Sequence, residues 1–193
     1  MQNYELIVID DKATLEKIGS VKSPVQEVFL RDNLTHLSFS DEELKRKKVG
    51  ISAAGFPPEW VNPDRISEVA ANSPPILIEN YICGSTTLLI VLYDPNKKAP
   101  AAAVDIYGFM SLGCLMQNIW VAAQELGIGM QILSLSATAS VEKELKQILE
   151  VPEKLKIAYT IRVGYPAVPD NYLRVRRDID DFTHYNKYGV RGI

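Results

Sequence analysis

The sequence has few of the residues that build metal sites or disulfides. Its 193 residues include only two cysteines, Cys83 and Cys114, and two histidines, His36 and His184. The cysteines are far apart and show no metal-ligand spacing, so we expect both to be buried as small apolar side chains in a reducing compartment. Two histidines are too few for a histidine-rich zinc site.

The chain also lacks a dominant charge and a targeting segment. The formal net charge is −3, which gives no general reason to expect nucleic acid as a partner. The start, MQNYELIVIDD, has no basic region of the signal-peptide type, so we expect a cytoplasmic protein. The apolar stretch 105–129 reaches the length of a membrane span. It contains Gln117, Asn118, Gln124 and Glu125 and has no flanking Lys/Arg asymmetry, which favours a helix of a soluble domain and no membrane.

Several phosphate-binding and nucleophilic motifs are missing as well. There is no Walker phosphate loop and no GxGxxG after a strand. The Gly127-Ile128-Gly129 triplet is too short for a dinucleotide fingerprint, and it closes a helix where that fingerprint opens one. No GxSxG elbow occurs. The acidic group 178–181 lacks the glycine and the distal glutamate of a calcium loop.

One long apolar stretch, residues 105–129, organises the rest of the chain. It predicts a helix of about 20 residues, which is roughly 30 Å long. Gly127 and Gly129 are helix-stop signals. Apolar residues lie nearly all round this helix, so we expect it to be buried on most sides. Gly108 and Gly113 allow close backbone approach, for which helix packing is the ordinary use.

Strands and short helices alternate along the remainder. Apolar runs predict buried strands at 4–9, 86–93 and 155–163. Helices are expected at 13–18, 65–71, 141–149 (capped by Ser140) and, from a capping box at Ser40, through about Lys48. Residues 76–82 fit an extended segment or a short helix, residues 130–135 fit an extended loop or strand, and 50–63 is a proline-rich loop. One α+β or α/β domain over residues 1–193 is expected, with a single sheet.

Two basic clusters are candidate anion contacts. The run Lys45–Lys48 is most simply a solvated helix end, with a phosphate or cofactor contact as the alternative. Arg174, Arg176 and Arg177 form the second cluster. Arginine forks bind phosphate through two parallel hydrogen bonds, although such clusters usually pair with nearby surface carboxylates.

Residues 112–137, LGCLMQNIWVAAQELGIGMQILSLSA, resemble the central helix and following loop of the flavin-dependent nitroreductase family. Gln2-Asn3-Tyr4 before the first strand is similar to the family's Gln-Pro-Trp step, and Gly164-Tyr165-Pro166 to its Gly-Tyr-Pro step. Arg176-Arg177 with DIDDFTHYNKYG resembles the closing segment that reaches to the partner subunit. These pieces occur in the family's order and spacing.

This resemblance implies a homodimeric α+β protein with a nitroreductase-like fold. Helices would flank a central, mainly antiparallel sheet, with a long buried central helix and FMN at the subunit interface. The flavin would take hydride from NAD(P)H and pass electrons to a nitroaromatic, quinone or similar small-molecule acceptor. The cofactor would supply the chemistry, which fits the absence of an evident acid, base or nucleophile.

The resemblance also implies which residues hold the cofactor. The loop Gln131, Ile132, Leu133, Ser134 and Leu135 would lie beside the reactive ring, where a backbone N–H stabilises the reduced, anionic flavin. Gln2 and Asn3 would belong to the same site. By position, Arg176 and Arg177 are the candidates for the FMN phosphate, with Arg174 as a third.

The sequence departs from the family in one respect. It contains no counterpart of the Arg-rich, Ser-containing motif that precedes the first strand and grips the phosphate and ring. Losing several charge-assisted bonds, each worth about 1.5–3 kcal/mol, weakens binding by orders of magnitude. The alternative expectation is therefore a family-derived protein that has lost flavin and binds a ligand or partner.

Overall fold

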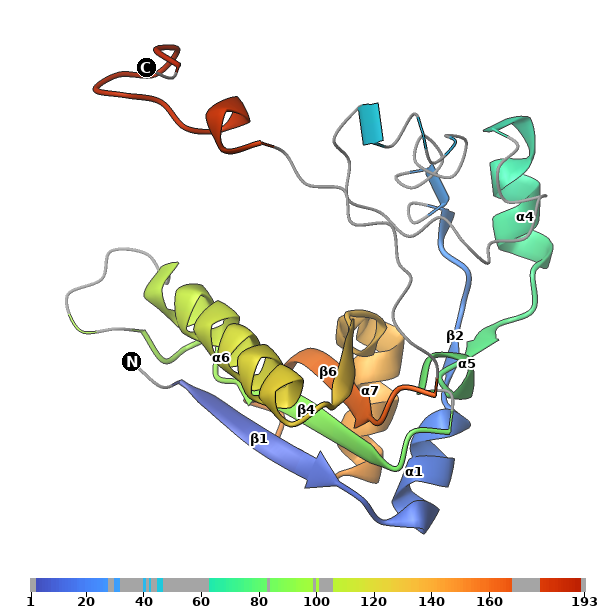
Figure 1. Ribbon diagram of the computed structural model, residues 1–193. Helices are drawn as coiled ribbons and strands as arrows, with labels where there is room; N and C mark the ends of the chain where they lie inside the picture. The colour runs from blue at the N-terminus through green and yellow to red at the C-terminus, as the bar shows by residue number, and fades with distance from the viewer. Residues whose placement is uncertain are drawn as a thin grey trace. The chain divides into compact units, whose positions relative to one another are not determined.

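The computed structural model describes residues 3–27, 30–31, 40, 42, 45–46, 63–82, 84–98, 100, 106–167 and 178–191 (Figure 1). The chain forms two compact units. One comprises Met1–Pro24 and Pro75–Val168, and the other Val25–Pro74 and Pro169–Ile193. The first unit holds the main sheet and the candidate site. A single domain over residues 1–193 stays a prediction.

A four-stranded antiparallel sheet is the framework of the first unit. Its strands are β1 (Tyr4–Ile9), β4 (Thr87–Tyr93), β6 (Lys156–Gly164) and β5 (Gly129–Leu133), in that spatial order. Every neighbouring pair in this sheet runs antiparallel, which confirms the predicted sheet type. β2 (Lys22–Ser23) and β3 (Ile76–Leu77) form a separate two-stranded pair. Residues 76–82, for which an extended segment and a short helix were the two alternatives, form the short strand β3 followed by the helix α5 (Glu79–Ile82).

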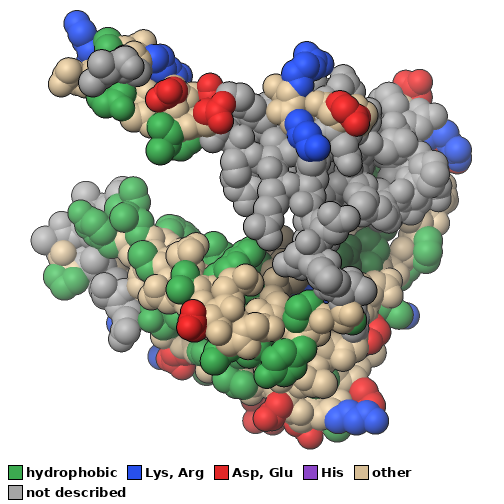
Figure 2. Space-filling model, viewed as in Figure 1, with side chains coloured by type: hydrophobic (Ala, Val, Ile, Leu, Met, Phe, Trp, Pro, Cys, Tyr) green, Lys and Arg blue, Asp and Glu red, His purple; other side chains and the backbone are tan. Residues whose placement is uncertain are grey.

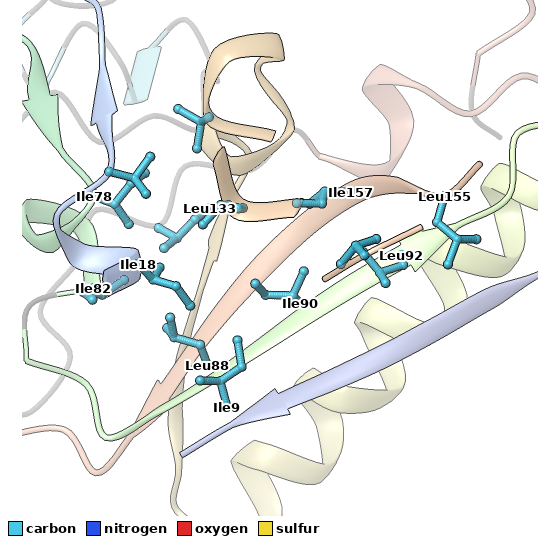
Figure 3. Packing of buried hydrophobic residues seen from close by; sticks show 14 residues of the cluster. Ile9, Ile18, Ile78, Ile82, Leu88, Ile90, Leu92, Leu133, Leu155 and Ile157 are labelled. Atoms are coloured by element: carbon cyan, nitrogen blue, oxygen red, sulfur yellow. The ribbon is translucent and has the colours of Figure 1, made fainter. Parts of the chain in front are cut away.

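The hydrophobic core lies on one face of the sheet. Leu88, Ile90 and Leu92 alternate along β4 and point to this face, where Ile9 of β1 joins them (Figure 3). Three helices cover them: α1 (Lys12–Gly19), α5 and α7 (Ala139–Ile148). The period of two in the strand and the apolar faces of the helices thus meet in one cluster, as the sequence pattern predicts.

Helices α1 and α7 differ in how their N-termini are capped. Asp11 caps α1, because its carboxylate accepts the Thr14 N–H at 2.8 Å and the Thr14 hydroxyl at 2.7 Å. These hydrogen bonds lower the pKa of Asp11. Ser140 does not cap α7, contrary to prediction. The cap is Thr138, which follows the short 3₁₀ turn η3 (Leu135–Ala137) with an extended backbone, so Ser140 falls in the first turn.

β1 is less buried than its apolar run predicts. Only Ile9 is buried in the strand, and Leu6 and Val8 are exposed. The reason is its place: β1 is an edge strand, and Leu6 and Val8 lie on the face away from the core. The expectation of a buried run holds for β4, which has a neighbour on both sides.

The predicted long helix is α6 (Ile106–Glu125), on the opposite face of the sheet from the core (Figure 1). It ends as expected at Gly127, whose φ of +66° is a left-handed conformation that suits glycine. The Ile128 N–H donates to the Ala123 carbonyl at 2.8 Å, and the Gly127 N–H to the Gln124 carbonyl at 3.1 Å. This pair of bonds is a Schellman motif.

Within the single chain, α6 is buried on one side only, not on most sides. Gly108, Leu112 and Ala123 are its buried residues. Cys114, expected to be buried, is exposed, and Cys83 lies outside the described residues. Both corrections have one cause: in the described part of this unit no second layer covers the outer side of α6. By length and composition α6 is the one helix among the described residues that could span a membrane.

The second unit contains shorter elements. Residues 63–72 form the predicted helix as a 3₁₀ turn, η2 (Pro63–Arg65), continued by α4 (Ile66–Asn72). Arg65 donates to both carboxylate oxygens of Glu68, at 3.0 and 2.8 Å. In the closing segment, η4 (Ile179–Asp181) has a capping box between Asp178 and Asp181. The expected loop 50–63, apart from Pro63, and most of the helix 41–48 lie outside the described residues.

Candidate flavin site

The predicted flavin-side loop forms an edge of the sheet. Gln131, Ile132 and Leu133 are the last residues of β5, and Ser134 and Leu135 lead into η3. Gln131 and Ser134 are exposed, whereas the Leu133 side chain belongs to the core. Among the described strands β5 pairs with β6 alone, so alternate backbone groups on its other edge have no strand partner. Backbone N–H groups of this kind can face a ligand.

Side-chain hydrogen bonds hold the turn after β5 in shape. The Ser136 hydroxyl donates to the Leu133 carbonyl at 2.9 Å, and the Thr138 hydroxyl donates to the Leu135 carbonyl at 2.9 Å. Ser136 is buried, so its bond is protected from water. The loop is therefore a fixed element at which a planar ring can be positioned.

Asn3 is a second candidate contact with an unusual environment. The side chain is only 4% exposed, and neither its Oδ1 nor its Nδ2 forms a hydrogen bond within the described part of the chain. The Asn3 backbone is fixed, because its carbonyl accepts the Asp94 N–H at 3.4 Å next to the β1–β4 ladder. Buried polar groups are nearly always paired, so an unpaired buried amide indicates a missing polar partner.

Asn3 and the β5 loop are not brought together within one chain. Asn3 directly precedes β1, and the loop begins in β5; these are the two outer strands of the sheet. Three interstrand spacings of about 4.8 Å place these edges about 14 Å apart. Gln2, Arg174, Arg176 and Arg177 lie outside the described residues, so their roles stay predictions.

α6 is attached to this sheet by a hydrogen bond from Tyr159. The phenol of Tyr159 in β6 donates to the Leu112 carbonyl of α6 at 2.8 Å. Burial, with a smaller contribution from Tyr4, raises the pKa of Tyr159. The phenol therefore stays protonated, and keeps donating, over the physiological pH range.

Comparison with known proteins identifies the family. Residues 1–165 match the nitroreductase family. The chain is a member of it. No curated protein sequence matches.

Solved nitroreductase structures share the fold at low sequence identity. The FMN- and NADPH-dependent nitroreductase NfnB from Sphigopyxis sp. strain HMH superposes with a TM-score of 0.57 and 14% identity, covering 96% of this chain and 81% of that one. An FMN-dependent nitroreductase from Clostridium difficile R20291 gives 0.53 and 14%, covering 96% and 76%. A nitroreductase-like family protein from Bacillus cereus gives 0.50 and 12%, covering 95% and 73%. The predicted nitroreductase-like α+β fold is confirmed.

The strand register places one further charged residue, which the sequence did not single out, beside the predicted loop. Arg162 of β6 lies directly opposite Gln131 of β5, and residues in such a pair share a face of the sheet. Arg162 is half-buried, and its side chain forms no ion pair or hydrogen bond with any residue that the structure describes. A single arginine inside a strand gives no signal until the register is known. The family match ends at residue 165, before the predicted phosphate arginines.

Proposed function

We propose that this chain is one subunit of a homodimeric FMN-dependent oxidoreductase. It takes hydride from NAD(P)H and delivers electrons to a nitroaromatic, a quinone or a similar small acceptor. The nitroreductase-family match over residues 1–165 is the observation that carries the proposal. When bound, FMN supplies the hydride and electron transfer, so the chain needs no acid, base or nucleophile of its own.

The Asn3 amide fits a flavin chemically. An amide offers an acceptor oxygen and two N–H donors, and a flavin ring carries both carbonyl acceptors and a ring N–H. Both polar atoms of Asn3 are free of partners in the described residues. Leaving such a buried group unsatisfied costs about 1–3 kcal/mol, which a ligand that pairs with it recovers. Because the amide is covered in the single chain, Asn3 would pair with the ring where binding displaces the atoms that cover it.

The β5 edge and Arg162 fit the other requirement, which is stabilisation of negative charge. Backbone N–H groups on the free edge of Gln131–Leu133 would donate toward the ring, and Ser134 is exposed beside them. Arg162 opposite Gln131 brings a permanent positive charge to the same edge. Preorganised donors and cations of this kind favour a developing anion without rearranging during the reaction.

The outer side of α6 supports the homodimer. Large apolar side chains are exposed along this helix (Figure 2): Ile106, Tyr107, Phe109, Met110, Trp120 and Val121. Leu6 and Val8 of β1 add to the apolar surface on the same face of the sheet. Monomeric soluble proteins rarely expose apolar patches of this extent, whereas a two-fold dimer covers the same patch on both copies.

A dimer also accounts for the separation within the site. Asn3 and the β5 loop are on opposite edges of one sheet, so we infer that each flavin takes its contacts from both subunits. Val121→Lys tests the interface. Val121 is exposed in the single chain, so a lysine there should destabilise the dimer without destabilising the folded subunit. We expect this variant to elute as a monomer in size-exclusion chromatography. Gln147→Lys, the same charge change on the exposed side of α7, should remain dimeric.

The activity is tested by oxidation of NADH and NADPH with the FMN-loaded protein. We expect turnover with a nitroaromatic or a quinone as acceptor, and loss of turnover in the Val121→Lys monomer. Absence of turnover with every nitro and quinone acceptor, in protein that has bound FMN, would contradict the proposed reaction.

A further inference from the structure

A histidine in the closing segment, residues 178–191 (red in Figure 1), accepts a hydrogen bond from the backbone. The Gly189 N–H donates to His184 Nδ1 at 3.0 Å. The His184 ring also lies against the ring of Tyr188, with centroids 4.3 Å apart and an interplanar angle of 34°. His184 is half-buried in the segment. One polar contact and one aromatic contact therefore hold its ring.

The hydrogen bond to His184 closes a short turn, Tyr185–Val190. Across this turn the Tyr185 N–H donates to the Val190 carbonyl at 2.9 Å. Asn186 and Gly189 have left-handed backbones, with φ of +62° and +92°, which asparagine and glycine adopt more readily than other residues. The turn thus reverses the chain and returns Gly189 to the residue that precedes it, His184.

The bond from Gly189 requires the histidine to be neutral. An imidazole nitrogen accepts a hydrogen bond only when it carries no proton, so the neutral ring must hold its proton on Nε2. In the protonated ring both nitrogens are donors, and the Nδ1–H of His184 would then face the Gly189 N–H. Histidine ordinarily changes its charge between about pH 5 and 8. Acidification within this range therefore removes the bond.

No carboxylate of the described chain forms an ion pair with His184. Arg191 likewise donates to a backbone group, the Asp180 carbonyl, at 3.1 Å. A protonated imidazole against an aromatic face keeps a favourable cation–π contact, so the ring can stay on Tyr188 when the bond to Gly189 is lost. The charged and titratable groups around His184 in this segment are Asp178, Asp180, Asp181, Tyr185, Lys187, Tyr188 and Arg191.

We propose that the turn Tyr185–Val190 is a pH-sensitive element. The bond between Gly189 and His184 holds it closed while the imidazole is neutral, and the turn loosens as the pH falls through the titration of His184. Loss of one such bond changes the equilibrium between the closed and the open turn about two- to tenfold. The proposal goes beyond the oxidoreductase activity and does not depend on FMN.

NMR of the full chain, labelled with ¹⁵N in glycine and histidine, tests the proposal. At pH 8 the ring of His184 should carry its proton on Nε2. The Gly189 amide should then exchange with water about two- to tenfold more slowly in the wild type than in His184→Phe, because phenylalanine keeps a ring against Tyr188 and has no acceptor. At pH 5 the two exchange rates should be equal. Comparing two proteins at one pH cancels the effect of pH on exchange itself.

His36→Gln is the matched control, because His36 is the other histidine of the chain. This variant should keep the pH dependence of Gly189 exchange, and its loss there would assign the response to the wrong histidine. A proton on Nδ1 at pH 8, or equal exchange in the wild type and His184→Phe at pH 8, would overturn the proposal. So would slower exchange in the wild type at pH 5 once the ring nitrogens show that His184 is protonated.

Discussion

Replacing Asn3 with Leu tests whether the buried amide is retained for a ligand. Asn3 is 4% exposed, and both its polar side-chain atoms lack a partner in the described residues. An unsatisfied buried polar group costs about 1–3 kcal/mol. Leucine has a similar size and removes this cost with little change in packing. We therefore expect the FMN-free variant to be more stable than the wild type by about 1–2 kcal/mol.

The assay is thermal unfolding with and without FMN. For a chain of this length, 1 kcal/mol corresponds to about 2–4 °C in Tm, so the FMN-free variant should melt several degrees higher. The effect on binding has the opposite sign. Losing one amide–flavin hydrogen bond, worth about 1.5 kcal/mol, should lower FMN affinity about tenfold, and the Tm increase caused by FMN should shrink.

Asn96→Leu is the matched control, because Asn96 is exposed in the turn after β4. It should change neither the Tm nor the FMN affinity appreciably. If Asn3→Leu melts below the wild type and binds FMN equally well, the reasoning on the unpaired amide is refuted.

Three further substitutions test the packing around the site. Glu142→Ala leaves the Ile157 N–H without its acceptor and should lower the free energy of unfolding by about 1–3 kcal/mol in urea, whereas Glu142→Gln should retain most of it. Tyr159→Phe loses the bond to the Leu112 carbonyl, about 1 kcal/mol. Burial raises the pKa of Tyr159 above its ordinary value of about 10. The neutral phenol therefore stabilises the wild type fully below about pH 10, and this stability is lost as the pH rises through the folded-state pKa. The free energy of unfolding of the Phe variant should not show this loss. Thr160→Val removes a buried hydroxyl that has no partner in the described residues and should raise the unfolding free energy by about 1 kcal/mol. A decrease in the unfolding free energy would indicate instead that the hydroxyl binds a water in the cavity of about 10 Å³ that Thr160 lines.

The long, strongly patterned segments of the fold were predictable from the sequence. Residues 105–129 predict α6 because the apolar run is long and ends in glycines, and the structure confirms the helix and its stop at Gly127. Strands 86–93 and 155–163 are likewise found as β4 and β6. Local pattern suffices for these elements because their periodicity extends over many residues.

Burial was harder to predict, because it depends on neighbours that are distant in sequence. The apolar run of β1 looks like a core strand, but Leu6 and Val8 are exposed since β1 is an edge. The outer side of α6 is exposed in the single chain for a similar reason. An apolar pattern predicts that a surface is buried, but it does not show whether the same chain or a partner buries it.

The candidate site likewise combines features that the local sequence predicts with features that only the folded structure shows. The position of the loop 131–135 follows from its place after α6, and the structure finds it at a sheet edge. The place of Arg162 beside Gln131 has no local signal, because it is defined by the pairing of β6 with β5. The unpaired state of Asn3 likewise emerges only when the atoms around its amide are known.

The measurement that tests the central claim most directly is the visible absorption spectrum of the purified chain after incubation with FMN and removal of the excess. The account predicts a retained flavin spectrum, close to one FMN per subunit, that bleaches on addition of NADH or NADPH. Protein that retains no flavin would contradict it, and a family-derived protein that has lost flavin and binds another ligand or partner would become the leading explanation.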